Sequence, residues 1–237
     1  MTKVHVLVRK EDLDRERLAG KVVVVVDVLF ATSTIVAALA HGATEVVPAL
    51  DGEAARAEAA RRPAGSCVLA GELDAVTLPG FAHPTPLAVV EGGVAGKALV
   101  YSTTNGTVAL RKAAGAARVY AGALLNGEAV VERVASLGGS DTVLLVCAGS
   151  AEAMNLEDFH GAGYLASLLA RRAGFELSDA ALAARLLAER ADALEVLSAG
   201  RIGRLMRARG LEREVAFAAR RSAYAAVPEL RGGVLTA

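Results

Sequence analysis

An α/β fold with a central parallel strand is the architecture that this sequence predicts. Val22 to Val26 is an unbroken valine run without polar alternation, which is typical of a strand covered on both faces. The run ends in Asp27, and an alanine-rich helical stretch over residues 35–40 follows it. Ligands of open α/β sheets bind at the carboxyl ends of the strands, and a helix start favours anions. Asp27 and the loop after it are therefore the first candidate site.

The bulk composition bounds the class of protein. The chain has 237 residues, 54% of them hydrophobic, and a formal net charge of zero. This length suits one large α/β domain or two small ones, and neither a linker nor a fixed repeat divides it, so a single domain over residues 1–237 is expected. The charge balance gives no reason to expect nucleic acid or an anionic membrane surface as partner.

The location of the protein is predicted from three negative features. The amino terminus is charged and lacks the apolar segment of a signal peptide, and no apolar stretch reaches the roughly 18 residues of a membrane helix. Cys67 and Cys147 both lie in apolar, strand-like runs and are expected to be free, buried thiols. A cytoplasmic protein is predicted, and a homodimer stays open because the sequence does not reveal oligomeric state.

The remaining elements follow from periodicity and from Gly, Pro and capping signals. Strands are predicted over residues 3–8, 44–49, 66–70, 97–102, 118–121, 142–147 and 223–227. Helices are predicted over residues 11–18, 51–62, 107–114, 127–136, 156–172, 178–197, 201–209 and 212–221. Residues 73–95 are rich in Pro and Gly and are expected to form a long functional or mobile loop. Asn155 is a predicted N-cap, with Asp158 completing a capping box.

Three apolar strands end in small polar loops, at residues 27–34, 102–106 and 148–150. If these strands are parallel neighbours, the loops converge. The hydroxyl, amide and backbone donors of such a site are Thr32, Ser33, Thr34, Thr103, Thr104, Asn105 and Gly106. Its carboxylates are Asp27, Glu72, Glu157 and Asp158. Hard oxygen ligands beside anion-binding loops suit Mg²⁺ and a phosphate ester.

Each of these features also has an ordinary structural interpretation. Asp27 and the hydroxyl residues after it are also suited to cap a turn and a helix, and Asn105-Gly106 is a common turn pair. Acids such as Glu157 in the first turn of a helix complement its dipole. No histidine pair has the spacing of a zinc site. The phosphate-binding GxxxxGK[ST] loop, the GxGxxG fingerprint and the GxSxG elbow are all absent from the sequence.

Long segments of the chain resemble the 2-phosphosulfolactate phosphatases, the ComB-like family. The most specific are VDVLFATSTIVAALAHGATEVVP (26–48), GKALVYSTTNGTVAL (96–110) and VCAGSAEAMNLEDFHGAG (146–163). Shorter matches are AGE (70–72), GF (80–81), AGALLN (121–126), and a carboxyl-terminal stretch from GR to LEREVAFAARRSAYAAVP. Their order and spacing cover nearly the whole chain.

The resemblance implies a three-layer α/β/α protein with a mixed, mostly parallel sheet. It implies Mg²⁺-dependent hydrolysis of 2-phospho-3-sulfolactate to 3-sulfolactate and phosphate, a step of coenzyme M or sulfolactate biosynthesis. Asp27, Glu72 and Asp158 would be catalytic, and these three with Glu157 would hold the metal. The hydroxyl and amide residues of the two loops would bind the substrate, a small anionic phosphate ester. Asp27 would act as a nucleophile or as a general base, and the sequence leaves both roles open.

The sequence departs from the family pattern at positions where cations are usual. Phe30 follows Asp27-Val28-Leu29 where the family usually has arginine, and Leu73 follows Glu72 where a second arginine is usual. Arginine forks are suited to phosphate, carboxylate and sulfonate groups. Two alternatives therefore accompany the leading interpretation. One is a phosphatase for a less charged ester, with Phe30 and Leu73 lining an apolar subsite; the other is a non-catalytic relative that binds an anion.

Overall fold

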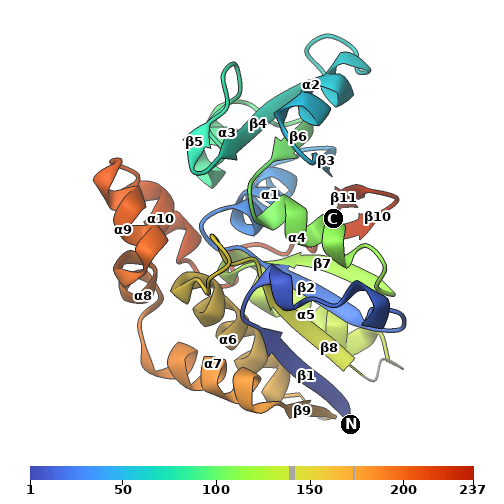
Figure 1. Cartoon of the computed structure of the whole chain (residues 1–237), viewed down its shortest axis with the longest axis vertical. Helices are drawn as coiled ribbons and strands as arrows, with labels where there is room; N and C mark the ends of the chain where they lie inside the picture. Colours follow the sequence, from blue (N-terminus) through green and yellow to red (C-terminus); the bar gives the residue numbers. More distant parts are fainter. Residues whose placement is uncertain (139–141, 173) are drawn as a thin grey trace.

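The computed structural model describes residues 1–138, 142–172 and 174–237 (Figure 1). Its strands are β1 (Thr2–Leu7), β2 (Val22–Val26), β3 (Glu45–Pro48), β4 (Cys67–Leu73), β5 (Val76–Thr77), β6 (Ala98–Ser102), β7 (Arg118–Gly122), β8 (Thr142–Cys147), β9 (Phe175–Leu177), β10 (Glu229–Arg231) and β11 (Val234–Thr236). Its α-helices are α1 (Ala31–Ala40), α2 (Gly52–Ala60), α3 (Pro86–Glu91), α4 (Gly106–Ala113), α5 (Gly127–Ser136), α6 (Leu156–Ala170), α7 (Asp179–Arg190), α8 (Ala193–Ala199), α9 (Arg201–Ala208) and α10 (Glu212–Ala218). Short 3-10 turns are η1 (Lys10–Asp12), η2 (Arg15–Arg17) and η3 (Leu124–Asn126).

The strands form one mixed sheet that consists of two parallel parts. Within the described residues the sheet has 11 strands in the order β5-β4-β6-β3-β11-β10-β7-β2-β8-β1-β9. The strands β4, β6 and β3 pair in parallel, and so do β7, β2, β8, β1 and β9. The antiparallel hairpin β10–β11 lies between the two parts and pairs with β7 on one side and with β3 on the other. The predicted mixed, mostly parallel sheet is confirmed.

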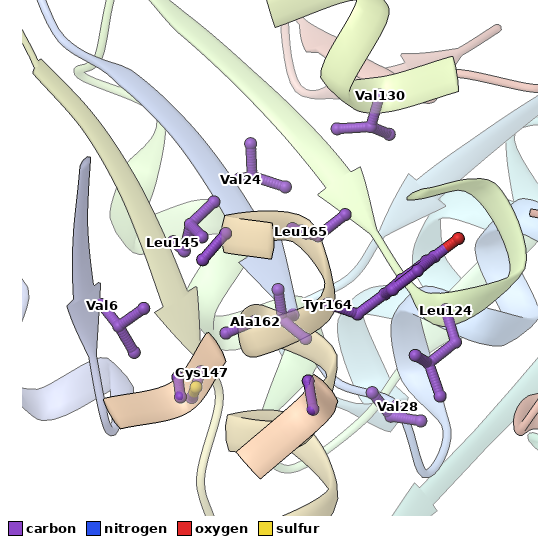
Figure 2. Close-up of a cluster of buried hydrophobic side chains, with 14 of the residues drawn as sticks. Val6, Val24, Val28, Leu124, Val130, Leu145, Cys147, Ala162, Tyr164 and Leu165 are labelled. Carbon is purple, nitrogen blue, oxygen red and sulfur yellow. The ribbon is translucent and has the colours of Figure 1, made fainter. Parts of the chain in front are cut away.

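The valines of β2 are buried between helices on both faces of the sheet. Val22, Val24 and Val26 belong to a core cluster with residues of α5, α6 and α7, part of which is drawn in Figure 2. Val23 and Val25 belong to a second cluster with residues of α1 and α4. All five valines are at most 2% exposed. Alternate side chains of one strand therefore contribute to opposite layers, which explains the absence of polar alternation and confirms the three-layer fold.

Several predicted element bounds differ from the structure. Helix α1 begins at Ala31, one turn earlier than predicted, and residues 73–95 contain β5 and α3 instead of being entirely a loop. The predicted long helix over residues 178–197 is divided into α7 and α8, since Asp192 caps α8 by accepting a hydrogen bond from Glu195 N. Residues 11–18 form two 3-10 turns. The predicted strand over 223–227 is wrong, and β10 and β11 take its place nearer the carboxyl terminus.

The carboxyl-terminal helices lie beside the two parts of the sheet. Figure 1 shows α8, α9 and α10 stacked along one side of the molecule, from the end of α7 to the neighbourhood of β5 and α3. The side chain of Glu214 in α10 accepts hydrogen bonds from Thr85 Oγ1, Leu87 N and Ala88 N at 2.6–3.0 Å, so it satisfies free donors at the start of α3. Across the described residues, no helix combines the length and the apolar character needed to span a membrane.

Candidate active site

A cavity of about 430 Å³ lies where the strand-end loops of both sheet parts meet α9. Asp27 enters it from the end of β2, Gly149 from the loop after β8, and Thr103 from the end of β6. The predicted convergence of the three loops is thus observed. The strands are not all neighbours, however, because β3, β11, β10 and β7 separate β6 from β2. The loops meet across two parts of the sheet.

Asp27 is the carboxylate placed most directly for chemistry. It is 7% exposed and lines the cavity, and among the described residues its carboxylate accepts only a long hydrogen bond of 3.4 Å, from Ala31 N at Oδ1. Its Oδ2 lies over Gly106, where an added Cβ would be only 2.6 Å from that oxygen. Burial, followed by the nearby carboxylate of Asp158, raises the pKa of Asp27 well above its ordinary value. A carboxylate with a free oxygen and a raised pKa is suited to accept a proton.

The hydroxyls of Thr32, Ser33 and Thr34 are turned away from the cavity. Thr32 Oγ1 donates to Asp27 O at 2.9 Å and accepts from Asp27 N at 3.0 Å. Ser33 Oγ donates to Val28 O, and Thr34 Oγ1 donates to Pro84 O. All three side chains are fully buried and none lines the cavity. They fix the turn that presents Asp27, so their role here is structural, but none of them caps α1, whose N-cap residue Phe30 makes no side-chain capping hydrogen bond.

The second loop is joined to Glu72 of β4. Glu72 Oε1 accepts from Thr104 N at 2.6 Å, and Oε2 accepts from Thr104 Oγ1 at 3.0 Å and from Ala75 N at 2.6 Å. Thr103 Oγ1 accepts from Thr107 N at 3.1 Å, inside the first turn of α4. Glu72, Thr103, Thr104 and Asn105 all line the cavity, whereas Gly106 lies behind Asp27. Both oxygens of Glu72 are therefore already hydrogen-bonded.

Asp158 connects the loops after β2 and β8 from behind the cavity. Its Oδ1 accepts from Val28 N at 2.9 Å and its Oδ2 from Gly149 N at 3.1 Å, so the predicted capping box with Asn155 does not form. Asn155 occupies the N-cap position of α6 without capping it, and its Oδ1 accepts from Ser150 Oγ at 2.7 Å. Burial and the neighbouring Glu157 raise the pKa of Asp158.

Glu157 lies against Gly200, directly before the start of α9, and does not line the cavity. It is 1% exposed, and an added Cβ on Gly200 would be 2.8 Å from its Oε2. Neither of its oxygens has a hydrogen-bond partner among the residues that the structure describes. Burial raises the pKa of Glu157, and the charge of Asp27 adds to the effect. Of the four predicted metal-binding carboxylates, two thus line the cavity and two lie behind its wall.

The donor set of the cavity suits Mg²⁺ held largely by water and substrate. In residues 1–138, 142–172 and 174–237, no group of three or more His, Cys, Asp or Glu side chains is placed to hold a metal ion. Mg²⁺ in phosphoryl-transfer enzymes is often held by one or two carboxylates together with substrate phosphate, and the free oxygen of Asp27 fits that pattern. The acidic residues of the cavity wall are Glu11, Asp27, Glu72, Asp74 and Glu152; its Lys and Arg residues are Lys10, Arg201 and Arg209.

Sequence reasoning missed the contribution of the carboxyl-terminal helices to this site. Arg201 and Arg209 line the cavity together with the apolar side chains Ile202, Leu205 and Met206. The region was predicted only as a short basic helix, and nothing in its local sequence indicates that it contacts strand ends far away in the chain. Phe30 lines the cavity as expected, but Leu73 is 60% exposed and lies outside it, so the apolar subsite predicted from that pair is wrong for Leu73.

The family of the chain is established by comparison with known proteins. The family model described as 2-phosphosulpholactate phosphatase matches residues 7–233. This chain belongs to the 2-phosphosulfolactate phosphatase family. A "Probable 2-phosphosulfolactate phosphatase" of Clostridium beijerinckii is 31% identical over 237 residues, which cover 99% of each chain. Another protein of that name, from Symbiobacterium thermophilum, is 44% identical over 182 residues, which cover 75% of this chain and 76% of the relative.

A third relative confirms the extent of the match. The protein of the same name from Deinococcus radiodurans is 36% identical over 215 residues, covering 90% of this chain and 88% of its own. The name describes a phosphoric monoester hydrolase. In this member of the 2-phosphosulfolactate phosphatase family, the cavity at the strand ends contains a carboxylate, hydroxyl groups and cations, which are the groups that such a reaction uses.

Proposed function

We propose that this protein hydrolyses 2-phospho-3-sulfolactate to 3-sulfolactate and inorganic phosphate in a Mg²⁺-dependent reaction. The observation that carries the proposal is Asp27, which faces the cavity with one oxygen free and lies beside the loop of Thr103, Thr104 and Asn105. Family membership supports the substrate. The reaction would supply sulfolactate, for coenzyme M synthesis or for other ends, in the cytoplasm, where the free thiols of Cys67 and Cys147 would stay reduced.

The strand-end residues would position the phosphoryl group. The amide of Asn105 lies at the cavity wall. Glu72 fixes the loop by accepting from Thr104 N and Thr104 Oγ1, so the Thr104 hydroxyl orients the loop and keeps no proton for the substrate. Lys10 Nζ donates to Asn105 Oδ1 at 2.9 Å and adds a positive charge at the same loop. Such groups stabilise the negative charge on the transferred phosphoryl oxygens, because they are already oriented before the substrate binds.

Asp27 would accept the proton of the attacking water, or would attack phosphorus itself. In the first case the water oxygen bonds to phosphorus, the bond between phosphorus and the C2 oxygen breaks, and a proton returns to that oxygen to give the hydroxyl of sulfolactate. In the second case a carboxylate oxygen bonds to phosphorus as the same bond breaks, and the leaving C2 oxygen takes a proton from solvent. Water then hydrolyses the aspartyl phosphate to phosphate and the free carboxylate. Acid-quenched single turnovers with ³²P-labelled substrate distinguish them, because only the second route leaves label on the protein.

Mg²⁺ would be held by the free oxygen of Asp27 and by the substrate's own oxygens, while Glu72, both of whose oxygens already accept hydrogen bonds, would hold the neighbouring loop. When bound, the ion supplies positive charge that neutralises the phosphoryl oxygens. The charge of the wall supports this assignment, because even without Asp27, whose pKa is raised by burial, four acidic side chains outnumber the three Lys and Arg side chains that line the cavity. An anionic ester would be repelled by that excess unless a cation accompanied it.

The test is phosphate release from racemic 2-phosphosulfolactate by purified protein, with Mg²⁺ and with EDTA. Metal-dependent release is expected. Absence of release from folded protein would contradict the proposal. In that event a thermal-shift titration with the same ester separates the alternatives, since binding without turnover indicates a non-catalytic relative. A panel of less charged phosphate esters tests the altered-substrate alternative, for which the apolar side chains of Phe30 and Leu205 at the cavity wall are the supporting observation.

A further inference from the structure

Two guanidinium groups of one short helical segment face the same cavity. Arg201 is the first residue of α9, Arg209 is its C-cap residue, and both line the cavity, as does Leu205 midway between them. Residues four and eight positions apart lie on one face of a helix, and eight residues span about 12 Å. The face therefore presents a cation at each end and an apolar side chain in the middle.

Neither of these arginines forms an ion pair in the part of the chain that the structure describes, although the charge of Arg201 acts to lower the pKa of the buried Glu157. Within the described parts of the chain, neither Arg201 nor Arg209 has a carboxylate oxygen within 4.0 Å, although eight other Lys and Arg residues do. Lys10, the third cation of the cavity, is paired with Glu11 at 2.9 Å. Two unpaired guanidinium groups at a cavity wall are an arrangement that an anionic ligand completes.

Neutral neighbours orient both side chains and leave donors free. The Nη2 group of Arg201 donates to Ser150 Oγ, and Asn155 Oδ1 lies 3.4 Å from it, while Nε and Nη1 make no hydrogen bond among the described residues. Arg209 donates from Nη1 to Ala75 O, in the turn between β4 and β5. Each guanidinium group is thus held by an uncharged group and still has N–H donors for a bidentate contact.

The helix that presents them is fixed to both parts of the molecule. An added Cβ on Gly203 would lie only 1.7 Å from Leu197 O, so α9 packs directly against the end of α8. Helix α10, which follows α9, is joined to the start of α3 through the three hydrogen bonds of Glu214. The arginine wall is therefore held in place before a ligand binds, which lowers the entropic cost of binding.

We propose that Arg201 and Arg209 bind the acid groups on the carbon skeleton of the substrate, while the strand-end loops hold the phosphoryl group. This inference rests on the proposed function and assigns its specificity. In 2-phosphosulfolactate the acid groups are a carboxylate and a sulfonate, which are planar and tetrahedral anions that arginine recognises. The arginines of α9 would thereby supply, from a part of the chain that is distant in sequence, the positive charge that Phe30 does not provide at the cavity wall.

The experiment compares Arg201→Ala, Arg201→Lys and Arg209→Ala with the control Arg207→Ala, whose side chain belongs to the same helix but does not line the cavity. Steady-state kinetics are measured with 2-phosphosulfolactate and with p-nitrophenyl phosphate, which lacks both acid groups. Each alanine variant is expected to raise KM for phosphosulfolactate about 10- to 100-fold, with kcat changed less than about threefold. Arg201→Lys restores part of the loss, and Arg207→Ala behaves as wild type.

The outcomes separate this inference from the proposed function. Turnover of phosphosulfolactate with an unchanged KM in both alanine variants would overturn the inference and leave the function intact. An equal rise in KM for p-nitrophenyl phosphate in these variants would have the same meaning. If the wild-type protein hydrolyses neither ester, the function fails and calorimetry with racemic 3-sulfolactate decides the inference. Binding by wild type and by Arg207→Ala that is weakened at least tenfold in Arg201→Ala supports it. Equal binding by all variants, or no binding by wild type at millimolar concentration, refutes it.

Discussion

The two walls of the cavity differ in chemistry and in origin. In the described part of the chain, the strand-end wall has Asp27 with one carboxylate oxygen free and a loop held by Glu72, whereas the α9 wall has two arginines outside any ion pair on either side of the apolar Leu205. The first is suited to a reaction at phosphorus, and the second to recognition of acid groups. The difference indicates a division of labour in which reaction and specificity depend on separate parts of the chain. Substitutions in the first wall should lower kcat, and those in the second should raise KM.

The largest effect is expected from Asp27→Asn. The variant keeps the shape of the side chain but loses the proton acceptor or nucleophile, so kcat should fall about 10³-fold or more. Because Asn can still accept from Ala31 N, the fold should be retained. Phosphate-release kinetics and circular dichroism measure the two properties. Near-normal kcat in this variant would remove Asp27 from the reaction.

Gly106→Ala should disturb the same wall without removing a functional group. The new Cβ would lie 2.3 Å from Ala31 Cβ and 2.6 Å from Asp27 Oδ2, so Asp27 must move, and kcat is expected to fall about 100-fold. Gly115→Ala is the matched control, because its Cβ would meet only Leu18 Cδ1 at 3.9 Å. Equal activity of the two variants would show that the position of Asp27 over Gly106 is unimportant.

The α9 wall should depend on the hydrogen bonds of Glu214. Glu214→Ala leaves Thr85 Oγ1, Leu87 N and Ala88 N without their acceptor, which is expected to lower the free energy of unfolding by about 2–3 kcal/mol. Glu214→Gln keeps one acceptor oxygen and should lose less. Urea denaturation measures stability, and KM reports the position of the wall. A KM unchanged in Glu214→Ala would show that α9 is held by other contacts.

The smallest effect is expected from the buried acidic side chains, which should make the stability of the protein depend on pH in the presence of a chelator. Burial raises the pKa of Glu157 to about 7, above its unfolded value of 4.5. The folded state therefore binds more protons than the unfolded state between these values, and stability should fall as pH rises from about 4.5 to above 7. Glu157→Gln removes this titration and should be more stable than wild type at pH 8 by about 1–2 kcal/mol, with little difference at pH 5. Thermal unfolding at both pH values measures the difference, and equal Tm values at pH 8 would contradict it.

The strand-end wall could be predicted from the sequence because its signals are local. A valine run that ends in Asp27, and a polar loop directly after another apolar strand, are visible in short windows. Within that wall, the roles of individual polar side chains were harder to predict from the sequence. The hydroxyl of Thr32 accepts a hydrogen bond from the backbone N–H of Asp27. Asp158 accepts from Val28 N and Gly149 N instead of capping its own helix. These choices depend on which segments meet in space.

The α9 wall could not be predicted, because its role comes from tertiary packing alone. Arg201 and Arg209 have the spacing of one helix face, but a surface helix with a solvated basic face has the same pattern. The sheet order was hidden for a similar reason, since the hairpin β10–β11 that joins the two parts comes from the end of the chain. Strands of three residues each, such as β10 and β11, carry little periodic signal, and the strand predicted over 223–227 was misplaced accordingly.

If one substrate spans both walls, a crystal structure of the Asp27→Asn variant with 2-phosphosulfolactate and Mg²⁺ shows this directly. The phosphoryl group and the ion are expected beside residue 27 and the loop of Thr104 and Asn105. The carboxylate or the sulfonate is expected within hydrogen-bond distance of Arg201 and Arg209. A phosphoryl group bound at the arginines, or acid groups that point away from α9, would show that the substrate does not span the two walls.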